Sequence, residues 1–225
     1  MRYPEEVVEE VRMKNDIVDV ISGYVKLQKK GSNYFGLCPF HNEKSPSFSV
    51  SPSKQMYYCF GCGAGGNVIT FVMEYENYSF MEALQMLADR AGVLLLDYLI
   101  GAKQRTGKMP ANPVALKTIV TTEMARKVAE TNGVKCFDTF TGFKFMAEKK
   151  NKLEASGEGK VIFSYEESYG YMLGDYVRDK DAVTAALLLT EMAAWYAGQG
   201  MTLYDALLAC YEKYGYYGEK TLNLV

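Results

Sequence analysis

Four residues that can ligate a metal ion stand in two pairs in the first third of the chain. Cys38 and His41 form one pair, Cys59 and Cys62 form the other, and each pair has two residues between its members. A two-residue gap lets one turn aim both side chains at the same ion, and two such turns complete a tetrahedron. Thiolate and imidazole ligands favour Zn²⁺. We therefore predict a structural zinc site that uses these four residues.

Two other interpretations explain less of the sequence. Cys59 and Cys62 could form a redox pair, but no strand–helix–strand pattern surrounds them as it does in thioredoxin-like folds. His41 could be a histidine of the apolar core. It is, however, the only histidine in the chain and it falls within the same frame as the cysteines. The zinc interpretation accounts for all four residues together.

Lysines and aromatic residues are concentrated around the predicted zinc site. Between residues 22 and 62, five lysines face a single acid, Glu43, although the whole chain has a net charge of −2. Lysines neutralise phosphates and aromatic rings stack on unpaired bases. This segment predicts contacts with single-stranded DNA, although the same aromatic residues could equally form the core of a small domain. The candidate DNA-binding residues are Lys29, Lys30, Tyr34, Lys44 and Lys54.

The elements that must position these residues can be predicted from periodicity. Apolar residues at helical spacing predict one or two short helices over residues 4–22 and further helices over 67–76 and 79–91. Between 24 and 58, short alternating runs broken by turn residues predict three or four antiparallel strands. Residues 1–94 are therefore predicted to form an α+β zinc ribbon, an antiparallel sheet with flanking helices.

The pattern changes at residue 95. Strand-like and helix-like segments then alternate, which predicts a parallel sheet covered by helices. Residues 95–225 are therefore predicted to be a separate α/β domain with a mixed, mainly parallel sheet. The predicted strands lie at 115–121, 134–140 and 160–165, and the predicted helices lie at 123–132, 142–153, 180–197 and 202–214.

No segment indicates export or membrane insertion. The N-terminus is acidic and lacks the apolar core of a signal peptide, and no apolar run approaches the eighteen or so residues of a membrane span. We expect a cytoplasmic protein with no membrane partner. Structural disulfides are rare in that compartment, which also favours metal binding by the cysteines.

With the ligands placed, the surrounding motifs resemble the zinc-binding (CHC2-type) domain of bacterial DNA primase. The motifs are CPFHNEKSPSF at 38–48, YCFGCG at 58–63 and GGNVITFV at 65–72, and the resemblance covers residues 1–93. It implies a zinc ribbon that helps a primase engage single-stranded template, in a replication context with partners such as helicase. A primase polymerises nucleotides on a separate catalytic domain, which nothing after residue 93 resembles.

Residues 95–225 resemble the third domain of bacterial phosphoglucomutases and phosphomannomutases. The resemblance rests on LLDYL at 95–99, TFTGFKF at 139–145, SYEESYG at 164–170 and RDKDA at 178–182. It implies a loop that holds the hydroxyls of a hexose phosphate. The implied sugar-binding residues are Thr141, Gly142, Glu166, Ser168 and Lys180. From the residues alone, Glu166 could instead be a solvated loop residue and Lys180 the start of a helix.

The sequence assigns no catalytic residue. These mutases also need a phosphoserine loop, an Mg²⁺-binding loop and a phosphate-binding loop, and no segment of the chain matches them. We expect Mg²⁺ to matter only if another chain supplies these parts. Two functions remain open: a single-stranded DNA-binding module of primase type, fused to a sugar-phosphate-binding mutase fragment, or a residual or partner-dependent phosphoglucomutase/phosphomannomutase.

Overall fold

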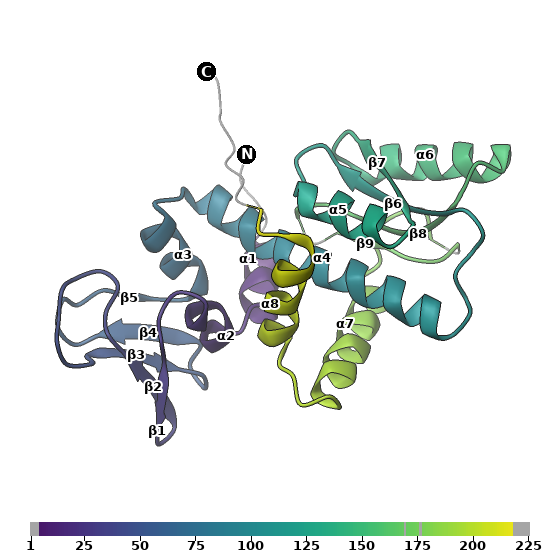
Figure 1. Cartoon of the computed structure of the whole chain (residues 1–225). Coiled ribbons are helices and arrows are strands. Elements are labelled where there is room, and N and C mark those ends of the chain that lie inside the picture. The colour runs from purple at the N-terminus through teal and green to yellow at the C-terminus, as the bar shows by residue number, and fades with distance from the viewer. Residues whose placement is uncertain (1–4, 169, 176, 218–225) are drawn as a thin grey trace. The chain divides into compact units, whose positions relative to one another are not determined.

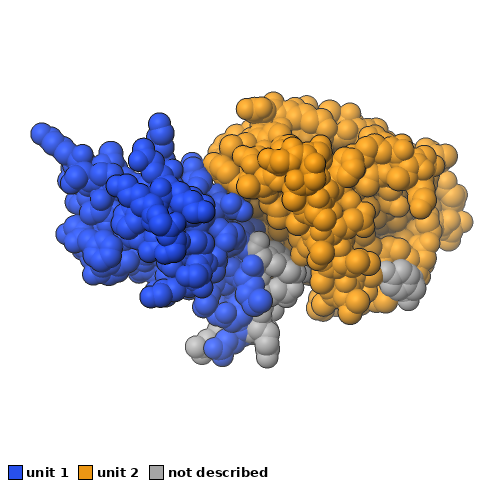
Figure 2. All heavy atoms as spheres, turned by 90° about the horizontal axis from the view of Figure 1, so that it is seen from below, with its two compact units in different colours: residues 1–87 blue, residues 88–225 orange. Residues whose placement is uncertain are grey.

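The chain folds as two compact units, and the computed structural model describes residues 5–168, 170–175 and 177–217 (Figure 1). Unit 1 ends at Leu87 and unit 2 begins at Ala88, as the colours of Figure 2 show. The boundary falls inside a helix, α4 (Phe80–Arg105). Within the described ranges, no helix has the length and apolar character needed to cross a membrane.

Unit 1 is built on a five-stranded sheet in which every neighbouring pair is antiparallel. The strands follow chain order: β1 (Gln28–Lys30), β2 (Asn33–Gly36), β3 (Phe48–Ser51), β4 (Met56–Cys59) and β5 (Gly65–Gly66). Gly31 opens the two-residue turn between β1 and β2 with φ +65°, the left-handed backbone that tight hairpins require. The predicted antiparallel ribbon is confirmed. The two-residue β5 was not predicted because it is too short to show alternation.

Three helices complete unit 1 beside the start of α4: α1 (Glu5–Lys14), α2 (Ile17–Ser22) and α3 (Val68–Glu76). The Asn67 side chain caps α3 by accepting hydrogen bonds from the N–H groups of Ile69 and Thr70, which satisfies donors that the first turn leaves open. Phe71 of α3 packs against two buried aromatics of the sheet, Phe48 and Tyr57, with ring centroids 5.5–6.1 Å apart. Some of the aromatic residues around the metal ligands therefore belong to the hydrophobic core of unit 1.

Unit 2 contains a four-stranded mixed sheet in the order β7-β6-β8-β9. Its strands are β6 (Pro113–Thr118), β7 (Lys135–Thr139), β8 (Lys160–Tyr165) and β9 (Tyr171–Met172). The first three are parallel and β9 pairs antiparallel with β8. The predicted mixed, mainly parallel sheet is confirmed, and β9 was missed because it has only two residues.

Helices cover both faces of the unit 2 sheet (Figure 1). The helices α5 (Glu123–Thr131) and α6 (Phe143–Ser156) pack against the strands, α7 (Ala182–Ala197) contacts β9, and α8 (Leu203–Tyr214) packs on α5 and α7. The crossover through α5 runs from β6 to β7, and the crossover through α6 runs back from β7 past β6 to β8. Right-handed connections therefore place the two helices on opposite faces. On the α6 face, Phe143 and Met146 join Val114 and Leu116 of β6 in one buried cluster.

The helix predicted over 79–91 does not end there, because α4 continues to Arg105. The apolar run Val93–Leu96, which marks the predicted change of domain, is buried in the middle of this helix. No proline interrupts it, and Gly92 has a packing role. A Cβ at Gly92 would lie 2.1 Å from the ring of Tyr165, so this glycine lets α4 pass close to β8.

Candidate functional site

The four predicted metal ligands meet beyond the ends of β2 and β4. Their ligand atoms all lie within 4.8 Å of one another. The Sγ atoms of Cys38 and Cys62 are 3.8 Å apart, and His41 Nδ1 lies 3.8 Å from the Sγ of Cys59. Ligands held about 2.3 Å from a zinc ion at tetrahedral angles are separated by about 3.8 Å. The donor set and its spacing therefore fit one tetrahedral zinc ion.

The turns that carry these ligands also stabilise their charge. The N–H groups of Phe40 and Gly61 donate to the sulfurs of Cys38 and Cys59 at 3.4 Å. Hydrogen bonds from backbone N–H groups stabilise a thiolate, which is the form that binds metal. Gly61 is required sterically as well, since a Cβ there would lie 2.6 Å from His41 Nε2.

A carboxylate that sequence reasoning did not assign to the site connects the ligands. Glu43 Oε1 accepts the N–H groups of Cys38 and Ser47 at 2.7 and 3.1 Å. Its Oε2 accepts the Ser47 hydroxyl at 2.5 Å and lies 3.3 Å from His41 Nε2. The imidazole thus has Nδ1 toward the sulfurs and Nε2 toward a carboxylate, an arrangement that orients metal-binding histidines and raises their basicity.

The cysteine pKa values differ across the cluster. Burial raises the pKa of Cys38 to about 12. Burial also acts to raise the pKa of Cys59, but the contact with the Ser47 hydroxyl and hydrogen bonds from the N–H groups of Cys62 and Gly61 outweigh it and hold that pKa at about 6. Of these two cysteines, Cys59 is therefore the one that loses its proton more readily.

The candidate DNA-binding residues lie on the strands and turns of unit 1. Lys29 and Lys30 are exposed on β1, and Lys29 Nζ lies 5.9 Å from the ring of Tyr34 on β2. Lys44 and Lys54 are exposed in loops. Tyr34 pairs with the buried Val50, and so projects to the inner face of the sheet, where it is only partly exposed.

The structure brings other aromatics to the outer face. Phe35, Ser49 and Tyr58 are register partners across three strands, so their side chains share that face. Tyr58 is half exposed, Phe60 is 71% exposed, and their rings contact edge to face with centroids 5.2 Å apart. Lys30 Nζ lies 5.9 Å from the ring of Phe35. The alternation along β4, with Tyr57 inward, was the signal that could have identified Tyr58.

In unit 2 three of the five implied sugar-binding residues are in direct contact at the carboxyl ends of β7 and β8. Glu166 Oε1 accepts the N–H of Gly142 at 2.5 Å, and its Oε2 accepts the Ser168 hydroxyl at 3.3 Å. Burial raises the pKa of Glu166, which the contact with Gly142 and the charge of Lys180 partly offset. Thr141 is exposed beside Gly142. Carboxyl ends of parallel strands are where open α/β sheets bind ligands.

Lys180 is exposed near Glu166. The carboxylate next to Glu166 in the sequence, that of Glu167, makes a separate contact. Lys180 Nζ lies 6.0 Å from the ring of Phe143 and 3.6 Å from the carboxylate of Asp179. Glu167 accepts a hydrogen bond of 2.7 Å from the Thr118 hydroxyl at the end of β6. This bond ties the loop after β8 to the adjacent strand, and sequence spacing carries no signal for it.

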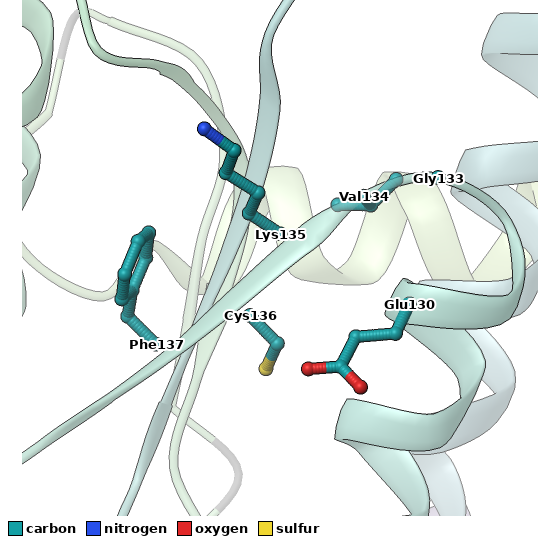
Figure 3. A pocket seen from close by; sticks show the side chains of 6 residues that line it. All are labelled: Glu130, Gly133, Val134, Lys135, Cys136 and Phe137. Carbon is teal, nitrogen blue, oxygen red and sulfur yellow. The ribbon is translucent and has the colours of Figure 1, made fainter.

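A separate groove of about 480 Å³ follows the edge strand β7 and contains none of these residues (Figure 3). The Cys136 thiol and the Glu130 carboxylate face the same space, while Lys135 and Phe137 project to the other side of the strand. Burial raises the pKa of Cys136 to about 11, so the thiol is neutral and weakly nucleophilic at neutral pH. The groove is not a candidate active site.

Two family models match the chain. Residues 3–100 match the model described as CHC2 zinc finger, and residues 88–214 match the model described as phosphoglucomutase/phosphomannomutase, alpha/beta/alpha domain III. The two matches overlap over residues 88–100, within α4.

Individual relatives are similar to the N-terminal part. The DNA primase of Geobacillus stearothermophilus is 58% identical over 104 residues, which are 46% of this chain and 17% of that primase. The DNA primase of Halalkalibacterium halodurans is 60% identical over 94 residues, 42% of this chain and 16% of that primase. The chain thus spans about one sixth of the length of these primases. A crystal structure of the Aquifex aeolicus primase (zinc-binding and RNA polymerase domains) is 37% identical, with coverage of 56% of this chain and 32% of that one and a TM-score of 0.37.

Proposed function

Because the chain belongs to the phosphoglucomutase/phosphomannomutase alpha/beta/alpha domain III family and carries a CHC2 zinc ribbon before that domain, we propose that it joins a zinc-dependent DNA-binding module to a sugar-phosphate-binding domain. The observation that carries the first half is the cluster of Cys38, His41, Cys59 and Cys62. Four protein ligands leave no open position on the ion, as in structural zinc sites. We assign the zinc a structural role, in which it holds the sheet and its loops in place.

Unit 1 binds single-stranded DNA along its sheet. Lys29, Lys30, Lys44 and Lys54 supply positive charge for phosphates, and Tyr34 is within reach of Lys29. The exposed rings of Tyr58 and Phe60 add a stacking surface on the outer face. Stacking of this kind contributes affinity with little sequence preference, because every base has an aromatic face. The similarity to DNA primases supports a template-binding role in replication, with partners such as helicase.

Contacts between lysines and phosphates predict how the affinity for single-stranded DNA changes with salt. Each phosphate contact on a single strand contributes about −0.7 to the slope of log affinity against log salt, so four lysines would give a slope of about −3. Raising salt from ~50 to ~200 mM would then weaken binding roughly 50-fold from a dissociation constant on the order of 10⁻⁴–10⁻⁶ M. A slope near zero would contradict the electrostatic contacts.

Fluorescence anisotropy of a labelled oligonucleotide with the full chain tests this proposal. Lys30→Gln should reduce the magnitude of the slope by about one contact, and Tyr58→Ala should weaken binding with the slope unchanged. Lys127→Gln is the matched control, because Lys127 is an exposed lysine of α5 in unit 2. Equal losses in Lys30→Gln and Lys127→Gln would place the binding outside unit 1.

Unit 2 holds the hydroxyls of a hexose phosphate through Glu166 and Ser168, with Thr141, Gly142 and Lys180 beside them. The contact of Glu166 with Gly142 and Ser168 supports this, because it directs a largely buried carboxylate at the open end of the sheet. Glucose 1-phosphate should shift the backbone amide signals of Gly142 and Ser168 in NMR spectra. Glu166→Gln should remove these shifts, and shifts spread evenly over both units would argue against the site.

The alternative is a phosphoglucomutase or phosphomannomutase that works only with a partner chain. Its supporting observation is the family membership of residues 88–214. Phosphoryl transfer depends on positioning and on Mg²⁺-assisted charge stabilisation, which orientation of the sugar alone does not supply. Turnover of glucose 1-phosphate with Mg²⁺ that co-purifies with the chain and disappears in Glu166→Ala would favour this alternative.

We also propose that the two parts were joined by fusion within α4. Both family models extend into residues 88–100, so each parent could supply a helix at the junction and no linker is needed. A continuous genomic read across codons 90–100 would support the fusion, whereas two separate reading frames would exclude it.

A further inference from the structure

A polar pocket of about 270 Å³ lies among the helices of unit 2 and shares no residue with the metal cluster or the sugar loop. Residues of α4, α7 and α8 line it, together with Asn132, which directly follows α5. Its volume lies just below the range of about 300–1,000 Å³ that is typical of pockets for organic ligands. A ligand of only a few carbons or a single oxyanion would fill it.

The pocket contains an arginine that lies over the ring of a tryptophan. The Arg105 guanidinium carbon lies 4.0 Å from the centroid of the Trp195 ring. A Cβ at Gly101, one helical turn earlier, would lie 2.9 Å from Arg105 Nη1. The glycine thus leaves room for the guanidinium to fold back along α4. Stacking engages the face of the guanidinium and leaves its N–H edge free to donate.

Among the residues that line the pocket, two cations, Arg105 and Lys213, face one carboxylate, Asp97. Lys213 Nζ is 3.5 Å from Asp97 Oδ1, and that carboxylate also accepts the Tyr214 hydroxyl. The nearby carboxylate of Glu191 accepts the Tyr98 hydroxyl. In the described ranges, no carboxylate forms an ion pair with Arg105.

A tyrosine adds a neutral donor to the same pocket. Burial raises the pKa of Tyr196, so its hydroxyl keeps its proton at neutral pH. Arg105, Lys213 and Tyr196 all line this one small space. Arginine forks of this kind match the oxygens of phosphate and carboxylate groups.

We propose that this pocket binds a small oxyanion, the phosphate or carboxylate group of a small metabolite, through Arg105 and Lys213 above the ring of Trp195. Arg105 supplies two parallel N–H donors and Lys213 a second charge. The aromatic floor holds the guanidinium in place before the ligand arrives, which lowers the entropy that binding must overcome.

The chain contains a single tryptophan, Trp195, so its fluorescence reports on this pocket alone. The full chain is titrated with inorganic phosphate at constant ionic strength, and in a second arm with acetate, against chloride as the reference. A saturable change with a dissociation constant on the order of 1 mM is expected, the weak end of specific binding. Saturation in the phosphate arm alone identifies a tetrahedral ligand, and saturation with acetate identifies a carboxylate.

Two variants distinguish a loss of anion binding from a loss of folding stability. Arg105→Lys keeps the charge but loses the planar fork, and should weaken binding about tenfold. Gly101→Ala displaces the guanidinium, and should weaken binding similarly while leaving the thermal midpoint equal or higher, because alanine favours a helix over glycine. Lys108→Gln, which removes an exposed lysine that does not line the pocket, is the control and should bind as the wild type does.

The proposal is overturned if neither anion changes Trp195 fluorescence beyond chloride at ten times the expected dissociation constant. It is equally overturned if Arg105→Lys and Gly101→Ala bind as tightly as Lys108→Gln. Phosphate-dependent amide shifts at Gly142 without a change at Trp195 would place the anion at the sugar loop and also reject the pocket.

Discussion

Replacing Glu43 by glutamine tests whether one carboxylate organises the metal centre. Its two oxygens take part in four contacts: with the N–H groups of Cys38 and Ser47, with the Ser47 hydroxyl, and with His41 Nε2. The Ser47 hydroxyl in turn lies 3.2 Å from Cys59 Sγ. Three of the four metal ligands are therefore connected to this side chain directly or through one hydroxyl.

The expected loss of zinc affinity depends on which contacts each substitution keeps. Glutamine keeps one oxygen, which can still accept the two backbone N–H groups, but its NH₂ group cannot accept from Ser47 or from a protonated His41 Nε2. Alanine loses all four contacts. Loss of such supporting contacts commonly weakens metal binding 10–100-fold. We expect Glu43→Gln near the lower end of this range and Glu43→Ala near the upper end.

Competition with a chromophoric chelator measures the zinc affinity of each variant. His41 is the only histidine, so its ring signals in NMR spectra are unambiguous and should show zinc on Nδ1 with the proton on Nε2 in the wild type. Glu76→Gln, a carboxylate of α3 in the same unit, is the matched control. The reasoning is refuted if Glu43→Gln binds zinc within twofold of the wild type and its His41 ring signals do not move.

Three further predictions concern the metal, an ion pair and a packing contact. Cys59→Ser should lower the zinc content well below one equivalent and reduce the thermal stability of the chain, since metal binding is coupled to folding; elemental analysis with full zinc would contradict the assignment. Lys160 and Lys150 lower the pKa of Asp175 from its ordinary 3.8 to about 2, so their stabilisation is present above about pH 4 and lost as the pH falls through about 2. Asp175 is half exposed, so Asp175→Asn should cost only about 1 kcal/mol at neutral pH, with urea titrations of the two proteins converging in acid. Gly92→Ala should cost about 1–3 kcal/mol by overpacking against Tyr165, and an unchanged unfolding free energy would show that α4 can shift.

The strands β6–β8 and the helices α5–α8 of unit 2 were predictable because each is long enough to show its period. The strand predicted at 160–165 and the helix predicted at 123–132 match β8 and α5 to within a residue. The two-residue strands β5 and β9 form because neighbouring strands offer hydrogen-bonding edges. A short stretch of sequence does not show which strand will lie beside it. The continuation of α4 was missed for a different reason, since an apolar run inside a helix looks the same as the start of a buried strand.

The metal ligands were predictable because paired ligands two residues apart need only a local turn. Tyr34 is the aromatic that was predicted to bind DNA, and its register with Val50 directs it to the inner face. Tyr58 and Phe60 are the rings most exposed beside β4. That distinction depends on which strand pairs with which, and pairing is a property of the folded sheet. Alternation along one strand separates its two faces, but which face is covered follows only once the pairing of the strands is known.

Each of the two candidate sites in this chain depends on a carboxylate anchored by backbone N–H groups. In unit 1, the N–H groups of Cys38 and Ser47 hold one oxygen of Glu43, and its other oxygen reaches His41. In unit 2, the N–H of Gly142 holds one oxygen of Glu166 and leaves the other to Ser168. An anchored carboxylate loses little further freedom when it orients a ligand, so the folding of the backbone supplies the organisation that binding would otherwise require. The donor to Glu166 comes from a residue 24 positions earlier, so the Glu-Glu-Ser motif identifies the carboxylate but not the contact that directs it.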